Sequence, residues 1–61
     1  MVKVKDYPKE KYSAYFEVVD EGSEMVARIY DRKTGKVTEH RSKGSPDSWV
    51  KTEMAKHKRA T

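Results

Sequence analysis

The sequence predicts an α+β fold, in which a three-stranded antiparallel meander is followed by one C-terminal helix packed on one face of the sheet (βββα). Three observations predict it. Apolar and polar residues alternate over 12–19 and 24–30, as in half-buried strands. Gly22 and Gly35 follow these stretches, where the chain must reverse. Finally, Ser45-Pro46-Asp47 is typical of a helix start. With 61 residues and no cysteine, we expect a single small domain over 1–61 that folds on one core without disulfides.

The first eleven residues leave two interpretations open. Val2 and Val4 alternate with lysines and precede Pro8. This pattern predicts either a short extra N-terminal strand that ends at Pro8, which lacks the amide needed to continue a ladder, or a flexible basic arm. The arm is favoured, because only two apolar residues would anchor the strand.

The three-stranded sheet is expected within residues 12–42. The first strand covers 12–19 and ends at a turn over 20–23, in which Gly22 takes a positive φ angle. The second strand begins at Glu24 and leads into a loop where Gly35 has the same role and Asp31 bonds back to loop amides. The third strand, from Lys36 to about Arg41, is expected to be a solvent-tolerant edge.

The helix is expected over residues 45–59. Ser45 caps it, Pro46 takes the first helical position, and Asp47 complements the positive end of the helix dipole. A narrow stripe that begins with Trp49 and Val50 recurs at helical spacing and faces the sheet. Trp49 is expected to be the largest side chain in the core. The other expected core residues are Tyr12, Ala14, Phe16, Val18, Met25, Ala27, Ile29, Val37, Val50 and Met54.

Charge is segregated along the chain. Residues 13–31 contain five acids and one arginine, whereas residues 32–43 contain five basic residues and one acid. In a meander the two hairpin loops lie at opposite ends of the sheet, so an acidic turn at 20–21 faces away from a basic loop at 32–33. The start of the first strand and the end of the helix reach the basic end as well. The basic side chains expected to converge there are Lys9, Lys11, Arg32, Lys33, Lys36, Lys56, Lys58 and Arg59.

The sheet face away from the helix is the second candidate surface. It is expected to display Tyr15, Val26, Arg28, Tyr30, Thr38 and His40. Three interpretations stay open: aromatic and arginine side chains stack on unpaired bases, an apolar patch of Tyr15, Val19, Val26 and Tyr30 is covered by a second copy, or cross-strand tyrosines simply stabilise the sheet.

Sequence motifs give no support for an enzyme. The chain has no phosphate-binding glycine loop, no zinc-protease motif and no nucleophile-elbow serine, and its two histidines lack further spaced ligands. We therefore expect no catalytic residues, no metal site, no cofactor and no small-molecule substrate. The absence of cysteine and of a long apolar segment predicts a cytoplasmic protein without a membrane interaction.

The second half of the chain resembles a known family in shape. A glycine turn between strands, then Arg41-Ser42-Lys43-Gly44 and a helix bearing Trp49, looks like the strand-turn-strand-helix pattern of the small arm-binding domains of tyrosine integrases. That family inserts a strongly basic sheet into DNA, and Glu24 and Glu39 depart from this pattern.

A net charge of +4 and the converging basic side chains favour a non-enzymatic binding module. We expect it to contact DNA or RNA phosphates without strong sequence specificity, through the basic end together with Arg28 and Tyr30. The alternative is a protein-interaction or homodimerisation module that uses the outer sheet face or the edge of the third strand.

Overall fold

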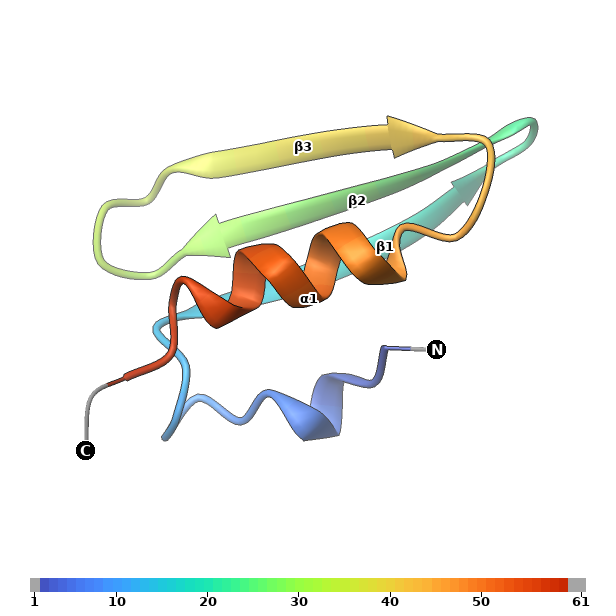
Figure 1. Cartoon of the computed structure of the whole chain (residues 1–61). Helices are drawn as coiled ribbons and strands as arrows, with labels where there is room; N and C mark the ends of the chain where they lie inside the picture. The colour runs from blue at the N-terminus through green and yellow to red at the C-terminus, as the bar shows by residue number, and fades with distance from the viewer. Residues whose placement is uncertain (1, 60–61) are drawn as a thin grey trace.

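A computed structural model, which describes residues 2–59, confirms the βββα fold (Figure 1). Strands β1 (Ala14–Glu21), β2 (Glu24–Asp31) and β3 (Val37–Ser42) form one antiparallel sheet in the order β1-β2-β3. Helix α1 (Asp47–Ala55) lies across one face of this sheet, and the N-terminal segment with its short 3-10 helix, η1 (Val4–Asp6), lies beside α1 on the β1 side. The meander brings the β2–β3 loop, the end of α1 and the chain before β1 to one end of the molecule (Figure 1).

The two glycine turns form as predicted. Gly22 and Gly35 both have a φ of +77°, a backbone conformation in which a Cβ atom would be strained. The Asp31 carboxylate accepts hydrogen bonds from the amides of Lys33 (2.8 Å) and Thr34 (3.2 Å), which confirms its role in the loop. The first turn is tighter than expected, because β1 extends to Glu21 and β2 begins at Glu24.

The register of β3 differs from the prediction by one residue. Val37 pairs with Tyr30 and Arg41 pairs with Val26, so Val37 lies on the outer face, where it is 50% exposed, and does not enter the core. Thr38 and His40, which were expected on the outer face, pair with Ile29 and Ala27 and therefore face the helix. The His40 ring stacks on Trp49 at 4.9 Å between centroids.

The core between sheet and helix is smaller than the predicted set. Its buried members are Ala14, Phe16, Ala27, Ile29, Val50 and Met54. Tyr12 and Trp49 pack against this cluster but keep some solvent contact, so the prediction that Trp49 is the largest buried side chain is wrong. Val18 was also expected in the core but is 38% exposed, because it lies on the edge strand β1 and lines an open pocket. Val26 is fully buried on the other face of the sheet.

Helix α1 is shorter at both ends than the predicted range. Pro46 occupies the N-cap position and its carbonyl oxygen accepts the first helical hydrogen bond, from Val50 at 2.9 Å. Ser45 Oγ still accepts a hydrogen bond from the Asp47 amide at 3.3 Å, although it stands one residue before the cap. After Ala55 the chain leaves the helix and pairs with the segment before β1. In residues 2–59 no helix is long and apolar enough to span a membrane.

The N-terminal segment fits neither of its two interpretations. Residues 2–11 contain no strand, and Val2 and Tyr7 pack against the core instead of extending into solvent as an arm. The Tyr7 ring makes edge contacts with Tyr12 at 4.9 Å and with Phe16 at 5.6 Å. Burial raises the pKa of Tyr7, and the neighbouring Tyr12 and Asp6 raise it further. This segment therefore completes the core along its open side.

Candidate nucleic-acid interface

Three segments that are distant in sequence meet at one end of the sheet. The Arg59 amide donates to the Lys11 carbonyl oxygen at 2.7 Å, and the Ser13 amide donates to the His57 carbonyl oxygen at 2.9 Å. The Arg32 amide donates to the Ser13 carbonyl oxygen at 2.9 Å. These backbone hydrogen bonds join the chain before β1 to the tail after α1 and to the β2–β3 loop. We call the basic side chains of these segments the basic pole: Lys9, Lys11, Arg32, Lys33, Lys36, Lys56, Lys58 and Arg59.

The two arginines of the basic pole hold its segments together. Arg32 Nη1 donates to the carbonyl oxygens of Tyr12 and Ala14, both at 3.2 Å, and so fastens the loop to the start of β1. Arg59 Nε donates to the Lys9 carbonyl oxygen at 3.1 Å. A guanidinium has five N–H donors, so each arginine keeps donors that can face a ligand. The contacts that Arg32 and Arg59 make in this structure nevertheless hold the segments of the pole together.

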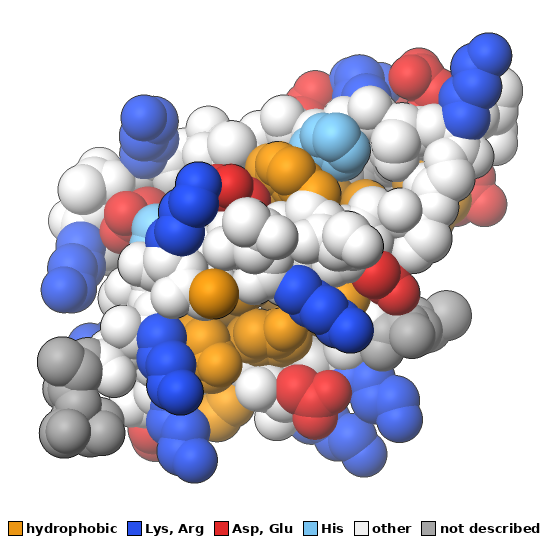
Figure 2. Space-filling model, viewed as in Figure 1, with side chains coloured by type: hydrophobic (Ala, Val, Ile, Leu, Met, Phe, Trp, Pro, Cys, Tyr) orange, Lys and Arg blue, Asp and Glu red, His pale blue; other side chains and the backbone are white. Residues whose placement is uncertain are grey.

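Five lysines of the basic pole project into solvent. Within residues 2–59, none of their ammonium groups forms an ion pair with a carboxylate. They are Lys9, Lys11, Lys33, Lys36 and Lys58, all exposed. Lys56 differs, because its ammonium is 3.0 Å from Glu53 Oε2. Figure 2 shows blue side chains along this end of the molecule, and further ones at the opposite end. The pole therefore presents positive charge on lysines and keeps its shape through arginines.

Asp31 adds negative charge at the same end, but its carboxylate faces the loop. The amides of Lys33 and Thr34 hold the pKa of Asp31 below its usual value, with a further contribution from His57. His57 Nδ1 is 3.8 Å from Asp31 Oδ2, so the imidazole lies next to the pole. The Asp31 carboxylate thus orders the loop that carries Lys33.

A hollow of about 470 Å³ lies within the pole, between the N-terminal segment and the tail. Its charged lining residues are Lys5, Lys11, Lys58 and Arg59 and one acid, Asp6, and Tyr12 also lines it. Four cationic residues and one carboxylate leave this concave surface net positive, which suits an anionic group such as a phosphate.

Arg28 and Tyr30 have their polar groups engaged with carboxylates. Arg28 donates from Nε to Glu39 at 3.1 Å and from Nη1 to Glu17 at 3.3 Å, and these hydrogen bonds, the one to Glu39 first, raise its pKa. The Tyr30 hydroxyl donates to Glu17 Oε1 at 3.0 Å, which raises the pKa of Tyr30. Tyr30 nevertheless borders the basic pole, because its ring stacks on Tyr15, which Arg32 also contacts.

The outer sheet face is a network of ion pairs and stacked rings. Arg41 bonds to Glu39 at 2.9 Å and to Glu21 at 3.1 Å, which extends the chain of charges that begins at Glu17 and Arg28. The Tyr15 and Tyr30 rings stack at 4.8 Å with an interplanar angle of 12°. The Arg32 guanidinium lies over the Tyr15 ring at 4.9 Å from its centroid. Because Tyr30 covers one side of Tyr15 and Arg32 the other, base stacking on this ring would require Arg32 to move.

The sequence identified the lysines of the pole but not the contacts that assemble it. The carbonyl oxygens of Lys9, Tyr12 and Ala14, which accept from the two arginines, carry no signal in a single sequence. Only the topology suggested that these segments meet.

Comparisons with known proteins give no match: no family model, no curated protein and no solved structure is similar to this chain. The resemblance to integrase arm-binding domains therefore rests on the sequence pattern alone.

Proposed function

We propose that this protein is a non-enzymatic module that binds the phosphate backbone of DNA or RNA through its basic pole. This proposal rests on the convergence of five exposed lysines from three segments at one end of the molecule, none of which forms an ion pair within residues 2–59. Each lysine that neutralises a phosphate releases condensed counterions, so the affinity falls as salt rises.

The chemistry of the pole favours weak sequence dependence. A lysine ammonium is a compact point charge that contacts phosphate without reading base edges, whereas bidentate readout of guanine needs a free arginine fork. Arg32 and Arg59 already donate to backbone carbonyl oxygens, and Arg28 is held between two glutamates. We therefore expect similar affinities for unrelated sequences of one nucleic-acid type.

The test compares two triple variants of equal charge. The first, Lys9→Gln with Lys33→Gln and Lys58→Gln, neutralises one lysine in each segment of the pole. The control, Lys3→Gln with Lys43→Gln and Lys51→Gln, removes the same charge from exposed lysines outside the pole. Binding of labelled single- and double-stranded DNA and RNA is measured by fluorescence anisotropy at several salt concentrations. For duplex DNA, each lost phosphate contact should lower the salt slope by about one, so the pole variant should lose about 2–3 and the control almost none.

Equal losses in the two variants would mean that binding follows net charge and not the pole. Absence of binding by the wild type at low salt would contradict the proposed function itself.

The alternative, a protein-interaction module, is less well supported on the outer sheet face. Val26 is fully buried by its own chain, and Arg28 and Arg41 are engaged with Glu17, Glu39 and Glu21. The backbone edge of β1 is a different surface, and it supports a protein-interaction module better than the outer sheet face does.

A further inference from the structure

Strand β1 is an edge of the sheet whose outer backbone groups are open to pairing. The Arg32 amide bonds to the Ser13 carbonyl oxygen, which makes Ala14 and Asp31 a non-hydrogen-bonded pair of the antiparallel ladder. Backbone groups therefore point towards β2 at Tyr15 and every second residue after it. At Phe16, Val18 and Asp20 they point away from β2, and no hydrogen bond from elsewhere in residues 2–59 reaches them.

The side chains of β1 do not protect this edge. The strand AYFEVVDE contains no lysine, arginine or proline, the residues that usually discourage pairing of edge strands. Its charged residues are the acids Glu17, Asp20 and Glu21, and Glu17 and Glu21 are engaged with arginines of β2 and β3. On β1, Tyr15 is 44% exposed and Val18 is 38% exposed. The open backbone groups at Phe16, Val18 and Asp20 are therefore a short template for another strand.

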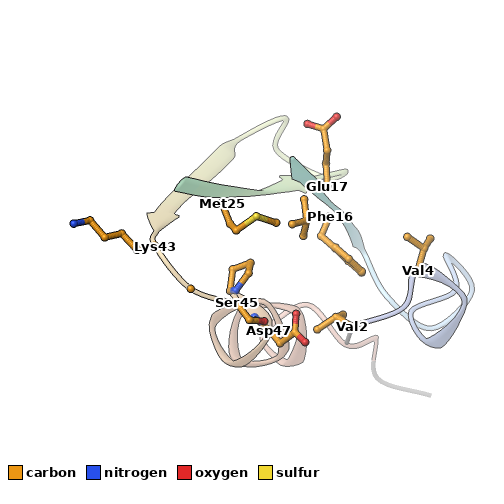
Figure 3. A pocket seen from close by; sticks show the side chains of 11 residues that line it. Val2, Val4, Phe16, Glu17, Met25, Lys43, Ser45 and Asp47 are labelled. Atoms are coloured by element: carbon orange, nitrogen blue, oxygen red, sulfur yellow. The ribbon is translucent and has the colours of Figure 1, made fainter. Parts of the chain in front are cut away.

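An apolar pocket continues this edge beneath the sheet. Helix α1 has nine residues and is about 14 Å long, whereas β1 has eight residues and spans about 26 Å, so the helix leaves one end of the sheet uncovered. The result is a cavity of about 780 Å³ lined by Phe16, Val18 and Met25 on the sheet side and by Val2 and Val4 on the other. In Figure 3, Phe16 and Met25 point into it from the sheet, and Val4, which is 67% exposed, lies on the β1 side.

The distribution of charge along β1 favours a second copy of this chain as the partner. The basic pole lies at the start of β1, while Asp20 and Glu21 lie at its end. A second copy that pairs antiparallel to β1 would place its acidic end beside the basic pole of the first, and the reverse on the other side. Opposite charges would thus meet twice, whereas a parallel arrangement would bring like ends together.

We propose that two copies of this chain associate through their β1 edges, in an antiparallel arrangement with a two-fold axis near Val18. This register pairs Phe16 of each copy with Asp20 of the other, so all the open backbone groups of Phe16, Val18 and Asp20 acquire partners. It also keeps the two Glu17 side chains from facing each other directly. The ladder stops before Ala14 and Gly22, because the Ala14 carbonyl oxygen accepts from Arg32 and the Gly22 amide donates to Asp20.

The pairing joins the two sheets into one of six strands and brings the exposed Val4 and Val18 of each copy next to the other copy. Such an edge contact is small compared with the roughly 1,200–2,000 Å² of a stable interface, so the dimer is weak and depends on concentration. It is also weakened by salt, because the attraction between opposite ends is screened.

Sedimentation equilibrium of two matched variants tests the proposal. Val18→Lys places two ammonium groups near the axis, and we expect its dissociation constant to rise at least about tenfold. Val37→Lys makes the same substitution on the edge strand β3, at a residue that is 50% exposed, and should dimerise like the wild type. Both positions are exposed, so both variants should fold, which circular dichroism checks. Loss of dimer in Val37→Lys but not in Val18→Lys would overturn the proposal.

Hydrogen exchange supplies a second, independent measurement. The amides of Phe16 and Val18 should exchange rapidly at low protein concentration and become protected as concentration rises, while those of Tyr15 and Glu17, which bond to β2, should change little. A wild type that remains monomeric at a concentration on the order of 1 mM and low salt would overturn the proposal and leave the edge to a strand of another protein. Protection of Phe16 and Val18 that does not depend on concentration would overturn it too, because the chain itself would then cover the edge.

Discussion

Replacing Met54 by alanine should remove most of the stability of this protein. Met54 is fully buried, and it and Val50 are the two buried residues of α1. A helix of nine residues is marginal on its own, so α1 is held in place by these contacts with the sheet. Met54 therefore joins the helix to Phe16 and Ile29 in the core.

The magnitude follows from burial and size. Truncation of a buried methionine to alanine costs about 2–5 kcal/mol, since the lost transfer energy adds to the cavity that remains. A core in a chain of this length rarely supplies more than about 3–5 kcal/mol in total. Because each kcal/mol lowers the melting temperature of a small domain by about 4–8 °C, Met54→Ala should melt at least about 8 °C lower or be unfolded at 25 °C.

Thermal and urea unfolding followed by circular dichroism measure this effect. Met54→Leu conserves volume and should cost less than about 1.5 kcal/mol, which separates the cavity from any special role of the sulfur. Val18→Ala is the matched control on the same sheet face, because Val18 is 38% exposed. If Met54→Ala and Val18→Ala cost the same, the argument that α1 is held through Met54 would be refuted.

Two further predictions concern the carboxylates. Arg41→Met should raise the pKa of Glu39 in an NMR titration, and by more than Arg28→Met does, because the hydrogen bond from Arg41 is the larger cause of its low pKa; an unchanged pKa in both variants would argue against the ion-pair network. The folded state lowers the pKa of Asp31, so its contribution to stability is complete above the unfolded pKa of about 3.9 and disappears as the pH falls through the lower folded value. Urea midpoints between pH 2 and pH 5 should therefore vary less in Asp31→Asn than in the wild type, and identical curves would show that loop amides do not favour the Asp31 carboxylate.

Hydrophobicity alone did not predict which residues of β3 face the helix. Val37 was expected in the core because it is the clear apolar residue of its strand. The Asp31 amide, however, donates to the Lys36 carbonyl oxygen at 2.9 Å and so closes the loop there, which places Val37 opposite Tyr30 on the outer face. Loop closure therefore outweighs the burial of one valine, and a shift by one residue reverses both faces of the strand. His40 moves to the helix side and stacks on Trp49.

Features that depend on a few neighbouring residues were predicted more reliably than contacts between separate segments. The positive φ angles of Gly22 and Gly35 follow from turn chemistry within a few residues, and both were predicted. The packing of Tyr7 on Phe16 joins segments on either side of a turn, and the hydrogen bond from Arg59 to Lys9 joins residues far apart in the sequence; neither was predicted. A basic N-terminal segment and a basic tail look alike in a sequence whether they extend into solvent or fasten to each other. The lysines of the pole could therefore be chosen by charge, but its shape could not.

The two proposed surfaces are linked by their charges. Antiparallel pairing of β1 edges would place Asp20 and Glu21 of one copy near the basic pole of the other, where a nucleic acid would also bind. A polyanion and the acidic end of the second copy would then compete for the same lysines. By thermodynamic linkage, nucleic acid must weaken the dimer by the same factor as dimerisation weakens nucleic-acid binding. The separation of acidic and basic residues along the chain would in this way couple nucleic-acid binding to dimerisation.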